Sequence, residues 1–269
     1  MPRIALGLEY DGSAFAGWQS QPHARGVQSV VEKAIALVAD HPVGVVAAGR
    51  TDAGVHAAIQ VVHFDSPSVR SQRSWVLGTN ANLPRYVSAL WAAEVPDSFH
   101  ARFGAMSRSY RYFILNRQVR PALRAGNVTW IREPLDHERM HVAAQQLIGQ
   151  HDFSSFRAAE CQSRSAIRRL QDIQVRRQGE LLCIDVTANA FLHHMVRNIA
   201  GTLIAVGRGD QPIEWVGKVL EARDRKVGGI TAPPDGLYLA GIQYEGTLNL
   251  SSTAGELLGF PCPVRRDQV

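Results

Sequence analysis

The sequence predicts an α+β protein built from two halves of similar organisation. In the first half, patterns typical of strands and helices follow one another in the order strand, helix, strand, strand, helix, strand. The second half has a broadly similar mixture, although sequence identity between the halves is too weak to call a repeat. With 269 residues, of which 45% are hydrophobic, the chain can bury a sizeable core in one large domain or two smaller ones.

The elements of the first half follow from short apolar patterns. Its predicted strands are residues 4–10, 43–49, 59–64 and 87–95. Ser29 and Glu32 have the spacing of a capping box, which predicts the start of a helix. A second helix covers Trp75 and is expected to end before Asn80.

The second half contains strands and helices of the same kinds. Its predicted strands are residues 109–115, 167–177, 180–188 and 237–245. The middle two form a hairpin that turns near Gly179. Asp136 opens a helix that Gly149 closes, a longer apolar helix covers residues 193–206, and Pro212 lies in the first turn of a last helix.

The boundary between the halves is expected near Met106. Residues 1–105 then form an N-terminal domain that carries the segment AGRTDAGVHA, and residues 106–245 form a C-terminal domain. The tail, residues 246–269, contains several glycines and prolines and is expected to be irregular. A cleft between two such domains is a natural place for a binding site.

Composition argues against several classes of protein. No apolar run reaches the roughly 18 to 20 residues that a membrane span needs, and the N-terminus lacks a secretory signal pattern. We therefore expect a cytoplasmic protein without a membrane partner. Cys161, Cys183 and Cys262 are far apart and form no CxxC pair, so neither a cysteine zinc site nor a disulfide framework is indicated.

Positive charge is concentrated in two intervals of a chain whose net charge is +5. No acidic residue lies between Asp97 and Glu133, and this interval contains Arg102, Arg108, Arg111, Arg117, Arg120, Arg124 and Arg132. A second patch contains Arg164, Arg168 and Arg169. The patches are either solvated basic faces or surfaces that bind phosphates, and the excess of arginine near tyrosines favours RNA. We expect Arg168 and Arg169 to contribute to the affinity for such a partner.

The segment AGRTDAGVHA places Asp52 between Gly49 and Gly54 and beside Arg50. Two interpretations are open. Asp52 can shape its own turn by accepting main-chain N–H groups, as in an Asx-turn. It can also be a reactive carboxylate that a nearby cation such as Arg50 keeps ionised.

Two further stretches combine polar residues with apolar surroundings. In NAFLHHMVRNIAG, Arg197 lies near the start of an apolar helix, where a guanidinium needs an anionic partner. That partner is either any nearby acid or Asp52. In SRSYRYFI, Tyr110 and Tyr112 point to the same face of a predicted strand. They either pack in the core or offer a ring that stacks on a base.

The segment HERMH, residues 137–141, matches the zinc-binding pattern HExxH with Glu138 in the position of the base. It falls in the first turns of a helix, and the sequence shows no third ligand, so we expect solvated helix residues and no metal. A metal-dependent hydrolase stays open as an alternative, and it predicts a loss of activity in chelator. A second alternative is an RNA-binding module without catalysis.

Seven blocks of sequence together resemble the TruA-type tRNA pseudouridine synthase family. They are YDGSAFAGWQSQ, AGRTDAGVHA, NANLP, FHARFGAMSRSYRY, HDFSSFR, ANAFLHHMVRNIAG and PPDGLYL, and they run from about residue 4 to residue 244. The resemblance implies the pseudouridine synthase fold, in which two RRM-like or ferredoxin-like halves with mainly antiparallel sheets flank a basic cleft. It implies an isomerase that converts uridine to pseudouridine at positions 38, 39 and 40 in the anticodon stem-loop of tRNA. It also implies a homodimer that uses no metal and no other cofactor.

The same resemblance implies roles for particular residues. The nucleophile of the family falls on Asp52, its active-site tyrosine on Tyr110 and its carboxylate-pairing arginine on Arg197. Arg50 is similar to an arginine that helps to flip the target base, and Leu237 matches an apolar residue that lines the uracil pocket. The residues leave open whether Asp52 acts at C1′, C6 or C2′, and which base removes the proton from C5.

Overall fold

The computed structural model describes residues 1–245, 252–253 and 258–260, and they form two compact units. The first unit joins Met1–Met106 to the part of the chain that begins at Leu239, and the second is Ser107–Tyr238. The break after Met106 lies next to the expected boundary, whereas the chain returns to the first unit within strand β10 (Leu237–Tyr244). The expected irregular tail, residues 246–269, lies almost entirely outside the described residues.

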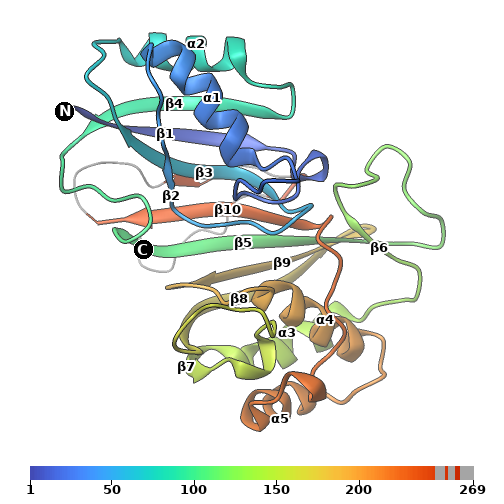
Figure 1. Ribbon diagram of the computed structural model, residues 1–269. Helices are drawn as coiled ribbons and strands as arrows, with labels where there is room; N and C mark the ends of the chain where they lie inside the picture. Colours follow the sequence, from blue (N-terminus) through green and yellow to red (C-terminus); the bar gives the residue numbers. More distant parts are fainter. Residues whose placement is uncertain (246–251, 254–257, 261–269) are drawn as a thin grey trace, which may run out of the picture. The chain divides into compact units, whose positions relative to one another are not determined.

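The first unit is a sheet covered by two helices (Figure 1). Its elements are β1 (Arg3–Tyr10), α1 (Val27–Ala39), β2 (Val46–Ala47), β3 (His56–Asp65), α2 (Gln72–Asn82) and β4 (Val87–Val95). The strands follow the order β4-β1-β3-β10, with β2 also paired to β3, and β1 is antiparallel to both of its neighbours. The chain order of these elements is that of a ferredoxin-like unit, as the resemblance implies.

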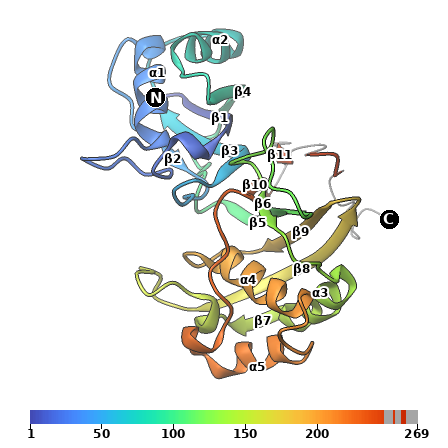
Figure 2. The same ribbon diagram turned by 90° about the vertical axis from the view of Figure 1, so that its right-hand side faces the viewer.

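The second unit combines strands and three helices (Figure 2). Its strands are β5 (Ala105–Asn116), β6 (Thr129–Ile131), β7 (Gly149–Asp152), β8 (Ile167–Gln178) and β9 (Leu181–Ala188). Its helices are α3 (His137–Ala144), α4 (Met195–Gly207) and α5 (Trp215–Ala222). Strands β5, β9, β8 and β7 are neighbours in that order with antiparallel pairing, and β6 is parallel to β5. The predicted α+β class with mainly antiparallel pairing is therefore confirmed.

Each unit has its own apolar core. In the first unit, the buried rings of Trp75 on α2 and Phe64 on β3 meet edge to face, with 5.2 Å between their centroids. In the second unit, Phe113 on β5 meets the ring of Tyr238 in the same way at 5.5 Å. Cys183 is fully buried on β9, as expected for a small hydrophobic side chain. Within the described residues, no helix combines the length and apolarity that crossing a membrane would take.

The predicted capping box at the start of α1 is wrong. The helix begins at Val27 with Gly26 as N-cap, and the Ser29 hydroxyl, inside the first turn, donates to the Gly26 carbonyl at 2.9 Å. Glu32 instead accepts the main-chain N–H of Val45 at 3.1 Å, which ties the helix to a later loop. The sequence spacing was compatible with a cap, but a distant main-chain donor uses the carboxylate.

Helix α2 continues past its expected end, through Asn82. The reason lies in β4, because the amide side chain of Asn80 donates to the Ala89 carbonyl at 2.8 Å and accepts the Ala89 N–H at 2.7 Å. Similarly, Pro212 precedes α5 rather than lying in its first turn, since its carbonyl accepts the N–H of Trp215, the first helical residue.

Other local predictions are confirmed. Gly179 turns the β8–β9 hairpin with a φ of +59°, a conformation that glycine adopts without strain. The carboxylate of Asp136 caps α3 by accepting the N–H groups of Glu138 and Arg139, both at 3.0 Å. The predicted closure of this helix by Gly149 is wrong, because α3 ends at Ala144 and Gly149, with a φ of +115°, is the first residue of β7.

His63, on β3, makes the stability of the first unit depend on pH. Its side chain is 5% exposed, its Nδ1 accepts the Ala101 N–H at 3.1 Å, and burial lowers its pKa to about 4. The unfolded chain, with a pKa near 6.5, therefore binds a proton more readily. The contribution of His63 to the free energy of unfolding is complete above pH ~6.5 and is lost as the pH falls towards 4, by up to about 3 kcal/mol.

We expect His63→Asn to remove this part of the pH dependence, because the amide oxygen can accept the Ala101 N–H but does not titrate. Chemical denaturation of both proteins between pH 7 and pH 4 measures the effect. Carboxylates titrate in the same way in the two proteins, so their effect cancels in the comparison. As the pH falls, the unfolding free energy of His63→Asn should therefore rise relative to that of the wild type. Parallel curves over this range would contradict the assignment.

Candidate active site

Asp52 lies in the first unit, in the loop between β2 and β3. Its carbonyl accepts the Val55 N–H at 3.1 Å and closes a tight turn in which Gly54 has a φ of +77°. The Gly54 N–H, which an Asx-turn at Asp52 would use, donates instead to the Phe15 carbonyl at 3.4 Å. The main chain therefore holds the turn.

The segment YDGSAFAGWQ packs closely against this loop. A Cβ on Gly12 would lie 1.9 Å from the Val55 carbonyl oxygen, and a Cβ on Gly17 would lie 2.8 Å from that of Thr51. The hydroxyls of Tyr10 and Thr51 form a buried hydrogen bond of 2.8 Å, and burial raises the pKa of Tyr10 to about 12. Backbone approaching backbone this closely requires glycine, and it fixes the path of the loop.

The other end of the loop is held from within β3. The fully buried side chain of Gln60 donates to the Gly49 carbonyl at 2.6 Å and accepts the Gly49 N–H at 3.4 Å. Between these fixed points, Asp52 is half-buried and Arg50 is exposed. The sequence therefore folds into a rigid loop that holds a carboxylate near the surface, with an arginine two residues before it.

Tyr110 and Tyr112 lie on β5 in the second unit, on one face of the strand as predicted. Tyr110 is 9% exposed, and its ring meets that of Phe191 edge to face at 4.9 Å. Tyr112 is completely buried, shares a hydrogen bond of 2.6 Å with the Thr129 hydroxyl and donates to the Pro233 carbonyl at 2.8 Å. The two tyrosines thus differ in role: Tyr112 holds the core together, and Tyr110 lies at its edge.

Arg197 lies in the first turn of α4 and is half-buried. Its Nε donates to the Ala232 carbonyl at 2.8 Å, and the Ala232 N–H donates back to the Arg197 carbonyl at 3.1 Å. Burial raises the pKa of Tyr112 strongly, while the positive charge of Arg197 acts in the opposite direction and the negative charge of Asp235 adds to the increase. The guanidinium is therefore held beside the segment PPDGLYL.

Residues of α4 that the sequence did not single out hold residues 229–231, just before PPDGLYL, against this helix. A Cβ on Gly201 would lie 1.7 Å from the Ile230 carbonyl oxygen. The buried amide of Asn198 accepts the Thr231 hydroxyl at 2.7 Å, and the Thr202 hydroxyl accepts the Gly229 N–H at 3.2 Å. The sequence feature that could have revealed this contact is the pair Asn198 and Thr202, which are four residues apart on a mostly apolar helix. Within PPDGLYL, Leu237 is buried at the start of β10.

Arg111 does not belong to the phosphate-binding surface that the sequence predicted. It is 2% exposed, and its Nε donates to Asp185, directly opposite on β9, at 2.9 Å. Arg176 donates to the same carboxylate. Other arginines of the interval are exposed, namely Arg102, Arg120, Arg124 and Arg132.

The second basic patch contains two different arginines. Arg168 is half-buried and holds its own loop, since it donates to the carbonyls of Ser165 and Ile167 and to the hydroxyl of Ser163. Arg169 is exposed on β8. Arg169 is therefore the better placed of the two to contact a phosphate.

The HERMH segment forms the start of α3. The Nδ1 of His141 accepts the Val175 N–H at 3.3 Å, and Glu138 is exposed in the first helical turn. In the described part of the chain, His137 and His141 have no third metal-binding side chain close to them. The segment thus ties α3 to β8.

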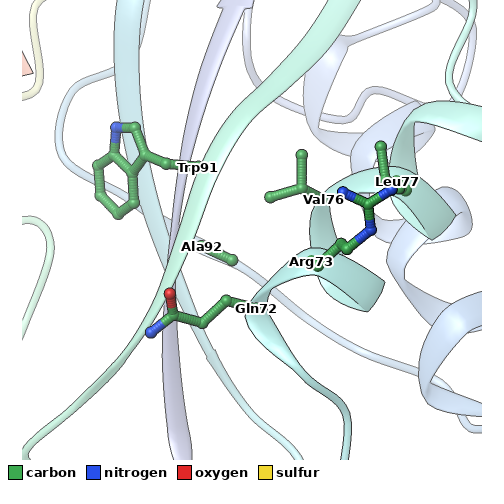
Figure 3. A pocket seen from close by; sticks show the side chains of 6 residues that line it. All are labelled: Gln72, Arg73, Val76, Leu77, Trp91 and Ala92. Atoms are coloured by element: carbon green, nitrogen blue, oxygen red, sulfur yellow. The ribbon is translucent and has the colours of Figure 1, made fainter.

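A shallow cavity of about 290 Å³ lies in the first unit between α2 and β4 (Figure 3). Its lining residues are Gln72, Arg73, Val76, Leu77, Trp91 and Ala92. None of them is an expected site residue. The cavity is open and mostly apolar. Its lining contains no carboxylate that could act as Asp52 is expected to act.

Comparison with known proteins connects these features. A family model described as tRNA pseudouridine synthase matches residues 8–104 and 143–245. A "tRNA pseudouridine synthase A" of Methylococcus capsulatus is 58% identical over 252 residues, which cover 94% of this chain and 93% of that protein. Proteins of the same name from Nitrosococcus oceani and Pseudomonas aeruginosa are 57% and 54% identical, over 90% and 92% of this chain and 93% and 87% of their own lengths. The chain therefore belongs to the tRNA pseudouridine synthase family, as its seven sequence blocks predicted.

Proposed function

We propose that this enzyme converts uridine to pseudouridine at positions 38, 39 and 40 in the anticodon stem-loop of tRNA, with Asp52 as its nucleophile. Membership of the family makes it an isomerase that acts on uridine in tRNA. The observation that carries the role of Asp52 is its loop, in which main-chain bonds hold the turn and Asp52 stays half-buried.

The reaction breaks the N1–C1′ bond, turns the uracil and rejoins it through C5. A carboxylate takes part only when it is ionised, whether it acts at C1′, at C6 or as a base at C2′. We propose that Arg197 is the cation that keeps Asp52 ionised, because a guanidinium stays protonated at any working pH. The mutual hydrogen bonds between Arg197 and Ala232 support this role, since they fix the orientation of the side chain.

The target base must leave its stack before a side chain can reach it, which costs a few kcal/mol. We propose that Arg50, exposed beside Asp52, helps to offset this cost, and that the buried Leu237 forms an apolar wall of the uracil pocket. Tyr110 then stacks on the extruded base, and its hydroxyl takes part in removing the proton from C5. We further propose a homodimer that binds tRNA in a basic cleft and works in the cytoplasm, with no cofactor.

Tritium at C5 of the uridines of tRNA tests the activity directly. Isomerisation replaces the bond from C5 to hydrogen with one from C5 to C1′, so tritium passes to water. We expect release that depends on the enzyme and stops when the target uridines are consumed. No release from any tRNA would overturn the proposed function.

The affinity for tRNA is expected to fall steeply with salt. Each phosphate contact contributes roughly 0.7–0.9 to the slope of log K against log salt, so several arginine contacts give a slope of several units. Arg169→Gln should reduce this slope by about one contact without slowing the chemical step of bound tRNA, because Arg169 is exposed on β8. Filter binding between 50 and 300 mM salt measures it, and a slope near zero in the wild type would contradict the electrostatic surface.

A further inference from the structure

Phe103 is a large aromatic side chain that the first unit leaves exposed. It lies in the segment between β4 and β5, and 78% of its surface is accessible. Its ring stacks on the imidazole of His100, with 4.4 Å between centroids and 29° between planes. The guanidinium of Arg102 lies 5.5 Å from the centroid of the same ring. One ring is thus held in a fixed stack beside a positive charge.

The main chain fixes His100 in this position. Its Nδ1 accepts the N–H groups of Arg102 at 3.2 Å and of Phe103 at 3.0 Å, and its carbonyl accepts the Gly104 N–H at 2.8 Å. Because Nδ1 is an acceptor, the neutral imidazole carries its proton on Nε2. A Cβ on Gly104 would lie 2.9 Å from the His100 carbonyl oxygen, so glycine permits the tight turn.

A second layer of rings supports the stack from below. The ring of His63 meets that of His100 at 4.9 Å and that of Phe99 at 6.0 Å, and both His63 and Phe99 are buried. The order from solvent to core is therefore Phe103, His100 and His63. Folding has already ordered Phe103, so a ligand that stacks on it loses little further conformational entropy.

Single exposed apolar side chains are common and need no explanation by themselves. This one differs in its rigid stack and in its surroundings. No acidic residue lies between Asp97 and Glu133, and the neighbouring Arg102 is exposed. A flat, ordered ring with a guanidinium beside it matches an unpaired nucleobase followed by its phosphate.

The platform is distant from the loop of Asp52. His56, whose Nδ1 accepts the Gly12 N–H next to that loop, and His63, below His100, are seven residues apart on β3. At a rise of ~3.3 Å per residue, they are separated by roughly 23 Å. A base stacked on Phe103 is therefore a different nucleotide from the one that reacts at Asp52.

We propose that Phe103, His100 and Arg102 form a second RNA contact, in which Phe103 stacks on an unpaired base of tRNA away from the reacting uridine and Arg102 contacts the adjacent phosphate. The inference rests on the proposed function, which supplies tRNA as the ligand. Stacking of this kind contributes about 1–3 kcal/mol per base, which corresponds to roughly 5- to 150-fold in affinity. The contact increases affinity and takes no part in the isomerisation itself.

The test compares Phe103→Ala with Phe103→Trp and with a control, Val69→Ala, which shortens an even more exposed apolar side chain of the same unit. We expect Phe103→Ala to raise the Kd for full-length tRNA by about ten-fold or more, and Phe103→Trp to keep the wild-type Kd. Val69→Ala should behave as wild type. At saturating tRNA, the single-turnover rate of Phe103→Ala should match that of the wild type, which separates binding from chemistry.

Each other outcome has a defined meaning. A wild-type Kd in Phe103→Ala, or an equal loss in the Ala and Trp variants, would overturn the stacking contact. If Phe103→Ala instead shifts the monomer–dimer equilibrium in sedimentation and leaves the Kd unchanged, a second copy of the chain covers the ring and the proposal is wrong. Failure of the wild type itself to bind and isomerise tRNA would refute the proposed function, so the two failures are distinguishable.

Discussion

The Asp52→Asn variant is expected to fold, to bind tRNA and to release essentially no tritium from it. An amide is neither a useful nucleophile nor a base, so the chemical step is lost. The loop should keep its shape, because the main-chain groups of Asp52, Gly54 and Val55 hold the turn. The affinity for tRNA should hold or rise slightly, since one negative charge has left a surface that receives phosphates.

The cost in stability should be small. A fully buried ion pair that loses one partner costs about 3–5 kcal/mol, but Asp52 and its proposed partner Arg197 are each half-buried, and exposed pairs contribute only about 0–1 kcal/mol. Thermal melting checks the fold, filter binding the affinity, and single-turnover tritium release the chemistry. Asp97→Asn, which removes an exposed carboxylate from the same unit, is the control and should be fully active. Substantial turnover by Asp52→Asn would show that Asp52 is not the nucleophile and only shapes its turn.

The Tyr110→Phe variant is expected to melt near the wild-type temperature but to isomerise uridine at least about 100-fold more slowly. A well-placed acid or base contributes roughly 10²- to 10⁴-fold to a rate, and only the hydroxyl is lost. The stacking contribution of the ring is retained in Phe. Single-turnover tritium release at saturating tRNA measures the effect. Near-normal rates would show that the Tyr110 hydroxyl takes no part in the chemistry and that the ring serves only for stacking.

Tyr112→Phe provides the matched control, and the expected pattern is the reverse. Its hydroxyl is buried between the Thr129 hydroxyl and the Pro233 carbonyl, and its loss leaves both without this partner. We expect a loss of about 1–3 kcal/mol in the free energy of unfolding, with a single-turnover rate close to that of the wild type. An equal loss of rate in the two variants would show that the hydroxyl of Tyr110 has no special role.

Local patterns were sufficient for most of the fold. Alternating apolar residues predicted β1 and β4, and glycine at residue 179 predicted the β8–β9 turn, because these features depend on near neighbours in the chain. The end of α2 could not be predicted, since Asn80 is held by the main chain of Ala89 on another element. The failed capping box has a similar origin, because Glu32 accepts the main-chain N–H of Val45 from a later loop.

The candidate site shows the same limit. The sequence placed Tyr110 and Tyr112 on one face of a strand. It could not show that the Tyr112 hydroxyl donates to the carbonyl of Pro233, which is 121 residues away. It also could not separate Arg111 from its exposed neighbours, because the partner Asp185 comes 74 residues later. Residue type and spacing thus identify candidates, and long-range partners decide which candidates remain accessible.

The most direct measurement of the central claim uses tRNA transcripts that carry C5-tritiated uridine and differ only at positions 38, 39 and 40. One series contains uridine at one of these positions at a time, and a further transcript has cytidine at all three. We expect enzyme-dependent tritium release, up to one equivalent, from each transcript with uridine in this stretch, and none from the transcript without it. Equal release from the transcript that lacks uridine there, or no release from any of them, would contradict the account.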